Sequence, residues 1–194
     1  MIGVNTKTIT RLRDHLLVEG SRKSIFMAGA EALEHPLEGD DEAKEVLDAV
    51  AEAMYLMISA DGKIEDAERE VLRGALRELT VGAMRSALIE QLLNGFEEAK
   101  QKEGQEARMN AIASVLCERP EAAEAAFVLS AAVAFADNEI ADEENDVLNG
   151  FAEKLGISNE RAEELLDGLE ADGSEMVPEL EVHTPLLSEA ILAT

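Results

Sequence analysis

The sequence predicts an all-α protein, and three observations support this prediction. Hydrophobic residues make up 46% of the 194 residues but aromatic residues only 3%, so the core must consist of Ala, Leu, Val, Ile and Met. These side chains suit helix–helix interfaces better than pleated sheets. Apolar positions also recur at helical spacing along most of the chain. Finally, one helix-turn-helix segment occurs twice, which indicates an internal duplication.

The helices are predicted from apolar stripes and from the residues that interrupt them. Gly20-Ser21 separates the first two, His35-Pro36 ends the second, Gly62 ends the third, and Pro120 suits the first turn of a later one. The first four predicted helices cover residues 6–19, 22–34, 41–60 and about Asp66 to Leu79. The next two are predicted from their apolar stripes, Met84, Leu88, Leu92 and Phe96 in one and Met109, Ile112, Ala113 and Leu116 in the other, and a seventh covers residues 120–136. The eighth carries Val147, Leu148, Phe151 and Leu155, and the ninth, capped by Ser158, carries Ala162, Leu165, Leu166 and Leu169.

The duplicated segment runs over residues 60–79 and returns over residues 136–155, at a constant offset of 76 residues. Nine positions recur: Ala60, Asp61, Ile64, Asp66, Glu68, Val71, Leu72, Gly74 and Leu79. The repeated acids lie at the predicted turn, where binding residues tend to lie. The repeated Val, Leu and Gly positions are typical of packing. Gly62 and its equivalent Asn138 both tolerate the left-handed conformation that ends a helix.

The charge distribution divides the chain into three parts. Residues 1–39 hold five basic and five acidic residues, so the whole formal net charge of −25 lies from residue 40 onward. We expect an N-terminal helical extension over residues 1–39, a helical domain over residues 40–170 with repeats near 43–79 and 120–155, and an acidic C-terminal tail over residues 171–194. This charge disfavours nucleic acid and anionic membrane surfaces and favours cations or a basic protein partner. The acids would equally serve as a solvating coat.

The chain has neither a stretch of about 18 apolar residues nor a signal-peptide pattern, which predicts a cytoplasmic protein without membrane insertion. Its single cysteine, Cys117, rules out an intramolecular disulfide and a thiolate metal cluster. Because Cys117 follows Val115 and Leu116, we expect it to be a small buried hydrophobic residue. The sequence leaves homo-oligomerisation open.

The acids at the two turns are the candidate metal ligands. They are Asp61, Asp66 and Glu68 in the first copy and Asp137, Asp142 and Glu144 in the second. Carboxylates and the carbonyls left free at a helix C-terminus could together hold a hard divalent cation, which favours Ca²⁺ or Mg²⁺ over Zn²⁺. The same acids could instead accept hydrogen bonds from the first amides of a helix and complement its dipole, without any metal.

The loops are not EF-hands, because position 12 is Leu72 when counted from Asp61 and Leu148 when counted from Asp137, where an EF-hand needs Glu. The pattern Ala-Asp-Gly-x-Ile-x-x-x-Glu over residues 60–68, repeated over residues 136–144, instead resembles the signature of the TerB family of tellurite-resistance proteins and TerB-like domains. The resemblance covers about residues 41–170. It implies an all-helical fold of paired, duplicated helices whose acidic turns are thought to bind divalent metal.

By position, the resemblance implies Asp61, Glu68, Asp137 and Glu144 as ligands, with Asp66 and Asp142 as weaker candidates; Asn138 in place of Gly is the one departure in the second copy. No nucleophile set, phosphate-binding loop or nucleotide fingerprint accompanies these acids, so we expect no enzyme and no organic cofactor.

We expect a non-enzymatic module that binds divalent cations and docks a protein partner in a stress-response or envelope-linked assembly. One alternative is a metal-independent acidic adaptor, like the TerB-like domains joined to co-chaperones, that docks through its N-terminal helices. A second is mimicry of nucleic acid towards a basic DNA-binding protein.

Overall fold

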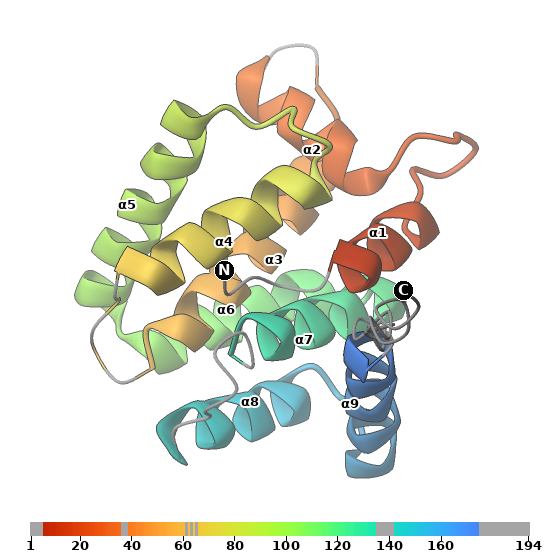
Figure 1. The fold of residues 1–194 in the computed structure, drawn as a ribbon. Helices are drawn as coiled ribbons and strands as arrows, with labels where there is room; N and C mark the ends of the chain where they lie inside the picture. Colours follow the sequence, from red (N-terminus) through yellow and green to blue (C-terminus); the bar gives the residue numbers. More distant parts are fainter. Residues whose placement is uncertain are drawn as a thin grey trace, which may run out of the picture.

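The computed structural model describes residues 6–35, 39–60, 62, 64, 66–134 and 142–174, with the backbone alone for residues 142–145 and 170–174. These residues form helices joined by turns, which confirms the all-α prediction (Figure 1). The helices are α1 (Thr6–His15), α2 (Ile25–Glu34), α3 (Asp41–Ile58), α4 (Asp66–Leu79), α5 (Ser86–Glu103), α6 (Gln105–Leu116), α7 (Pro120–Ala134), α8 (Asp142–Lys154) and α9 (Asn159–Ser174).

Helices α3 and α7 form the centre of the fold and pack against each other (Figure 1). Every residue from Ala49 to Ile58 of α3 and from Ala125 to Ala134 of α7 is buried. A helix that is covered on all sides needs no polar face, which explains the almost continuous apolar sequence of α7. None of the described helices has the length and apolarity needed to cross a membrane.

The N-terminal helices share this core. Ile9 of α1 and Phe26 and Ala30 of α2 belong to the same buried apolar cluster as the side chains of α3 and α7. Helix α2 approaches α3 so closely that a Cβ atom on Gly29 would lie 2.4 Å from the carbonyl oxygen of Ala43. Residues 6–35 are therefore an integral part of the packed helical body, although the charge distribution separates them from the rest.

The predicted start of the first helix and end of the second are confirmed, but the predicted end of the first helix and start of the second were wrong. Helix α1 ends at His15 and α2 begins at Ile25, and between them the chain makes a short antiparallel bridge from Leu17 to Ser24. The amide of Ile25 donates to the carbonyl oxygen of Leu16 at 2.9 Å. Backbone groups on either side of a turn satisfy each other here, and helical periodicity gives no sign of such pairing.

Two predictions about side-chain burial need correction. In the region of α5, Met84 and Phe96 are buried as predicted, although Met84 precedes the helix. Leu88 and Leu92 are half-buried and pack against the core, and the other buried residues of α5 are Ile89 and Leu93. Cys117 is exposed. It follows the last helical residue of α6, and the inward positions of that helix are Met109, Ile112, Ala113 and Leu116. The apolar residues that precede Cys117 in the sequence therefore did not predict whether its thiol is buried.

The repeated positions fall into two kinds. Leu72 and its equivalent Leu148 are buried, as expected for packing. The packing interpretation is wrong for the repeated glycines, because a Cβ built on Gly74 or Gly150 meets no heavy atom within 4 Å apart from its chain neighbours and the backbone of its own helix. Helices α4 and α8 begin at Asp66 and at residue 142, the offset that relates the two sequence copies.

Candidate functional site

The first set of predicted ligands follows the end of α3, and this end lies beside the C-terminal half of α5 (Figure 1). Ser59, only 3% exposed, caps α3. Gly62 has φ +87°, which is the left-handed conformation predicted for it. Asp66 is exposed in the first turn of α4, and Glu68 is half-buried. Asp61 lies outside the described residues.

The second turn joins α7 to α8. Asp142 is the first residue of α8, and Glu144 follows within its first turn. Asp137 lies outside the described residues, as do the side chains of Asp142 and Glu144. Within the part of the chain that the structure describes, no group of three or more His, Cys, Asp and Glu side chains is placed to hold a metal ion.

Lys100 of α5 reaches the first turn, although sequence reasoning did not select it. Its Nζ atom donates a hydrogen bond to the carbonyl oxygen of Ser59 and another, at 2.9 Å, to the Oγ atom of Ser59. The amide of Gly62 donates to the same carbonyl oxygen at 3.1 Å. A carbonyl oxygen has two lone pairs, so these two donors use its ordinary hydrogen-bonding capacity. An ammonium group is also stabilised at this position, where the helix dipole is negative.

Lys100 lines a cavity of about 300 Å³ between α3, the start of α4 and α5. The polar side chains that line it are Tyr55, Ser59, Arg69, Glu97, Lys100 and Gln101. Burial raises the pKa of Tyr55 to about 12; nearby Glu97 acts in the same direction and Arg69 opposes it. The phenol therefore stays neutral at physiological pH.

The cavity has the donor chemistry of a hard-cation site, but its described part does not fit a divalent cation. Tyr55, Ser59, Glu97 and Gln101 line the same space, and each has an oxygen-bearing side chain of the kind that hard cations bind. Yet the oxygens of Ser59 already accept hydrogen bonds from the positively charged group of Lys100. A divalent ion would need the same oxygens and would be repelled by the ammonium charge.

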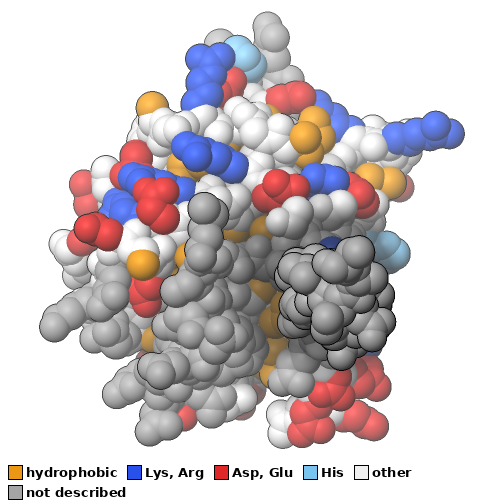
Figure 2. All heavy atoms as spheres, viewed as in Figure 1, with side chains coloured by type: hydrophobic (Ala, Val, Ile, Leu, Met, Phe, Trp, Pro, Cys, Tyr) orange, Lys and Arg blue, Asp and Glu red, His pale blue; other side chains and the backbone are white. Residues whose placement is uncertain are grey.

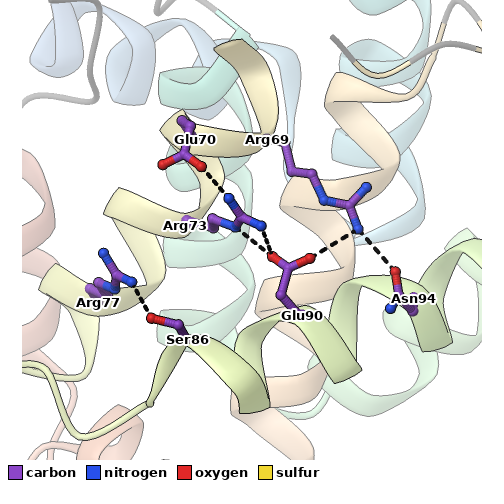
Figure 3. Close-up of polar contacts among 7 residues, drawn as sticks. All are labelled: Arg69, Glu70, Arg73, Arg77, Ser86, Glu90 and Asn94. Carbon is purple, nitrogen blue, oxygen red and sulfur yellow. Dashed lines mark hydrogen bonds and ion pairs between the residues drawn. The ribbon is translucent and has the colours of Figure 1, made fainter. Parts of the chain in front are cut away.

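A polar ladder joins α4 to α5 next to this cavity (Figure 3). The ladder consists of Arg69, Arg73 and Arg77 on α4 and Ser86, Glu90 and Asn94 on α5, and its members recur every four residues in both helices. Arg77 contacts Ser86, Arg73 contacts Glu90, and Arg69 contacts Asn94 at 3.0 Å and Glu90 at 3.5 Å. Hydrogen bonding to Glu90 contributes most to the raised pKa of Arg73. The four-residue spacing of the arginines was a sequence signal for this ladder, whereas nothing in the repeat indicated Lys100.

Acidic side chains extend over the face shown in Figure 2. Lys and Arg side chains lie over the half of this face that holds α1, α2, α4 and α5, where Asp and Glu side chains are interspersed with them, and a further group of Asp and Glu side chains lies at the far end of α9. Exposed acids on α9 include Glu160, Glu163 and Asp167. Arg161 forms ion pairs with Glu124 and Glu164, both at 2.8 Å.

The comparison with protein families agrees with the arrangement of helices and turns described above. The model of the family described as "Tellurite resistance protein TerB" matches residues 47–167, from within α3 to within α9, and so includes both turns but neither α1 nor α2. No curated protein and no solved structure matches the chain. Because the matched region spans more than half of the chain, the protein belongs to the TerB family.

Proposed function

We propose that this protein is a non-enzymatic cytoplasmic TerB-like module that binds a divalent cation at its acidic turns and docks a protein partner in a stress-response or envelope-linked assembly. The observation that carries the proposal is the recurrence of the same acids where α4 and α8 begin. Each turn follows one of the two central helices, α3 and α7. A cation bound there would stabilise the position of the first turn of the next helix, α4 or α8, relative to the core.

The candidate ligands are Asp61, Asp66 and Glu68 in the first turn and Asp137, Asp142 and Glu144 in the second. Carboxylates without imidazole or thiolate partners favour Ca²⁺ or Mg²⁺ over Zn²⁺. The second turn is the stronger candidate, because in the first turn Lys100 already interacts with the oxygens at the end of α3.

Calorimetric titration with Ca²⁺, Mg²⁺ and Zn²⁺ tests the cation part of the proposal. The intact chain should bind Ca²⁺ or Mg²⁺, and the double variant Asp137→Asn/Asp142→Asn should bind at least about tenfold more weakly, because two ligand charges are lost. The matched control is Asp167→Asn, which removes an exposed acid of α9 and should leave binding unchanged. Absence of binding heat and of a thermal shift with all three metals would refute this part.

The proposed partner is a basic protein that docks on the acids of α9. Exposed Glu160 and Glu163 provide the charge, and steering by such a surface should weaken as salt is added. The alternative, a metal-independent adaptor that docks through α1 and α2, is favoured by exposed Arg11 and by exposed Arg22 in the turn between these helices.

Cross-linking in cells with two charge-reversal variants separates the two docking surfaces. Glu160→Lys/Glu163→Lys should abolish the cross-linked partner if α9 is the docking surface, whereas Arg11→Glu/Arg22→Glu should leave it in place. The opposite result supports docking through the N-terminal helices. Substitutions are preferable to deletion of residues 1–39, because Phe26 of α2 is part of the core.

A further inference from the structure

The short hairpin between α1 and α2 has one backbone edge without a hydrogen-bonding partner. The bonds of its bridge are made by Val18 and Ile25, whose amides donate to carbonyl oxygens of the opposite strand at 2.9 Å. Leu17 lies between these bonds and opposite Ser24, so its own amide and carbonyl point to the other edge of the hairpin. Among the described residues, none is hydrogen-bonded to these two groups.

The side chain of Leu17 is also uncovered. It is 46% exposed, and in Figure 1 the connection between α1 and α2 projects from the helical body. Of the large hydrophobic side chains that the structure describes, only Leu17 and Val81 are exposed. An open strand edge beside an exposed apolar side chain suits an extended peptide that binds as an added strand. In this mode, main-chain hydrogen bonds provide affinity and side-chain contacts provide specificity.

Leu17 also lines a groove of about 630 Å³, the hairpin groove, which lies between the hairpin, the start of α3 and the start of α7. Its apolar lining includes Leu16, Val18, Ile25, Ala43 and Pro120. The open edge of the hairpin and an apolar groove thus meet at Leu17. Alternate side chains of a strand point to the same side, so a peptide paired with Leu17 can place every second side chain in the groove.

The charged side chains of the hairpin groove are mainly acidic. They are Glu19, Asp40, Glu42, Glu121 and Arg119, and all but Arg119 are exposed. Arg119 forms an ion pair with Glu42 at 3.0 Å. The bases of the hairpin itself, Arg22 and Lys23, do not line the groove, and Lys23 pairs with Glu31. The groove therefore attracts a peptide that carries Lys or Arg.

The same charge disfavours the two occupants that the chain itself could supply. A second copy has a formal net charge of −25. The C-terminal residues 175–194 contain Glu175, Glu179, Glu181 and Glu189 but neither Lys nor Arg. Both would bring like charges to the groove, which weakens binding. A basic segment of another protein has the complementary charge.

We propose that an extended, basic segment of a partner protein binds in the hairpin groove as a strand added to the edge at Leu17. Its backbone pairs with the amide and carbonyl of Leu17, and its alternate apolar side chains enter the groove. Its intervening Lys or Arg side chains interact with the exposed acids around the groove. The inference does not rest on the proposed function, because it needs no cation and the groove shares no residue with the acids of α9.

Fluorescence anisotropy with a labelled synthetic peptide, Lys-Val-Lys-Val-Lys-Val-Lys, tests the inference on the full chain. The peptide should bind the wild type, and Leu17→Ser should weaken this binding at least about fivefold, because part of the leucine contact is lost. Val81→Ser is the matched control, because it removes the other exposed large hydrophobic side chain, and it should leave the affinity unchanged. The isomer Lys-Lys-Val-Val-Val-Lys-Lys has the same charge without the alternation and should also bind at least about fivefold more weakly.

N-methylation of the peptide tests the backbone pairing without any change to the protein. Amides of successive residues in a strand point to opposite edges, so the lysine amides lie on one edge of the bound peptide and the valine amides on the other. Binding should be lost when one of these two sets is methylated and retained when the other set is methylated. Equal effects of the two sets would overturn the proposed pairing.

Equal affinity of the wild type and Leu17→Ser for the peptide, or of the wild type for the two isomers, would overturn the inference, because charge alone would then explain binding. Absence of binding at millimolar protein would overturn it as well. Displacement of the peptide by a synthetic peptide of residues 175–194 would assign the groove to the chain's own C-terminal segment. A dimer that Leu17→Ser dissociates in sedimentation would assign it to a second copy, and loss of binding in Glu160→Lys/Glu163→Lys would place the peptide on α9; each of these results would overturn the proposed partner.

Discussion

The repeated glycines give the sharpest prediction, because their environment contradicts the packing role that the sequence indicated. Gly74 is the ninth residue of α4, and Gly150 is the ninth residue of α8. Glycine within a helix costs about 1 kcal/mol relative to alanine, and a Cβ built at either position meets no heavy atom within 4 Å apart from its chain neighbours and its own helix backbone. Gly74→Ala and Gly150→Ala should therefore each raise the free energy of unfolding by about 0.5–1 kcal/mol.

Gly29 provides the opposite case within the same protein. A Cβ at Gly29 would lie 2.4 Å from the carbonyl oxygen of Ala43 and 2.8 Å from the Cβ of Leu47. The nearest atom belongs to the backbone, so α2 would have to move away from α3. Overpacking of this kind costs about 1–3 kcal/mol, and Gly29→Ala should destabilise the protein by that amount.

Urea unfolding followed by far-ultraviolet circular dichroism measures all three variants. In a protein of this size a change of 1 kcal/mol moves the melting temperature by about 2–4 °C, so thermal scans provide a second measurement. Because Gly74 and Gly150 lie in different helices, the double variant should show the sum of the two gains. Destabilisation by Gly74→Ala or Gly150→Ala, or a neutral Gly29→Ala, would refute the reasoning.

Three further predictions concern buried charge, backbone strain and pH. Arg108→Ala should cost about 3 kcal/mol in urea unfolding, because it leaves Glu52, 4% exposed, without the guanidinium that binds it at 2.7 and 2.8 Å. Val81→Gly should raise the melting temperature, with a gain of about 0.5–1 kcal/mol, because Val81 is exposed and has φ +53°. Burial raises the pKa of Asp48, so the folded state binds this proton more tightly than the unfolded state does. The free energy of unfolding of the wild type, compared with that of Asp48→Asn, should therefore fall as pH rises from about 4, the ordinary pKa of Asp, through the raised pKa. Unfolding curves of both proteins at a series of pH values measure this pH-dependent loss, which should be absent below about pH 4.

Much of the fold could be predicted because the signals were local. Hydrophobic periodicity and helix-terminating residues predicted α3, α4 and α7 almost correctly, and Pro120 begins α7 as expected. The errors arose where contacts between residues distant in sequence determine the helix ends and the buried faces. The bridge between Leu17 and Ser24 shortened both N-terminal helices, and the choice between two overlapping stripes on α5 depended on which face meets the rest of the core.

The candidate site was less predictable than the fold. The repeat located the turn, and Gly62 adopts the conformation that its position required. Lys100 was not predicted, because its role depends on the packing of α5 beside the end of α3. A lysine in a run of charged residues gives no local sign that its ammonium group reaches a helix terminus in another part of the chain.

The contacts of the polar ladder match one position of α5 along α4. A shift of α5 by one helical turn, about 5.4 Å, would place Arg69 opposite Glu90 and Arg73 opposite Ser86, and Arg77 would lose its partner on α5. The same shift would carry Lys100 away from Ser59. The same position of α5 therefore satisfies the three arginines of α4 and brings the ammonium group of Lys100 to the end of α3.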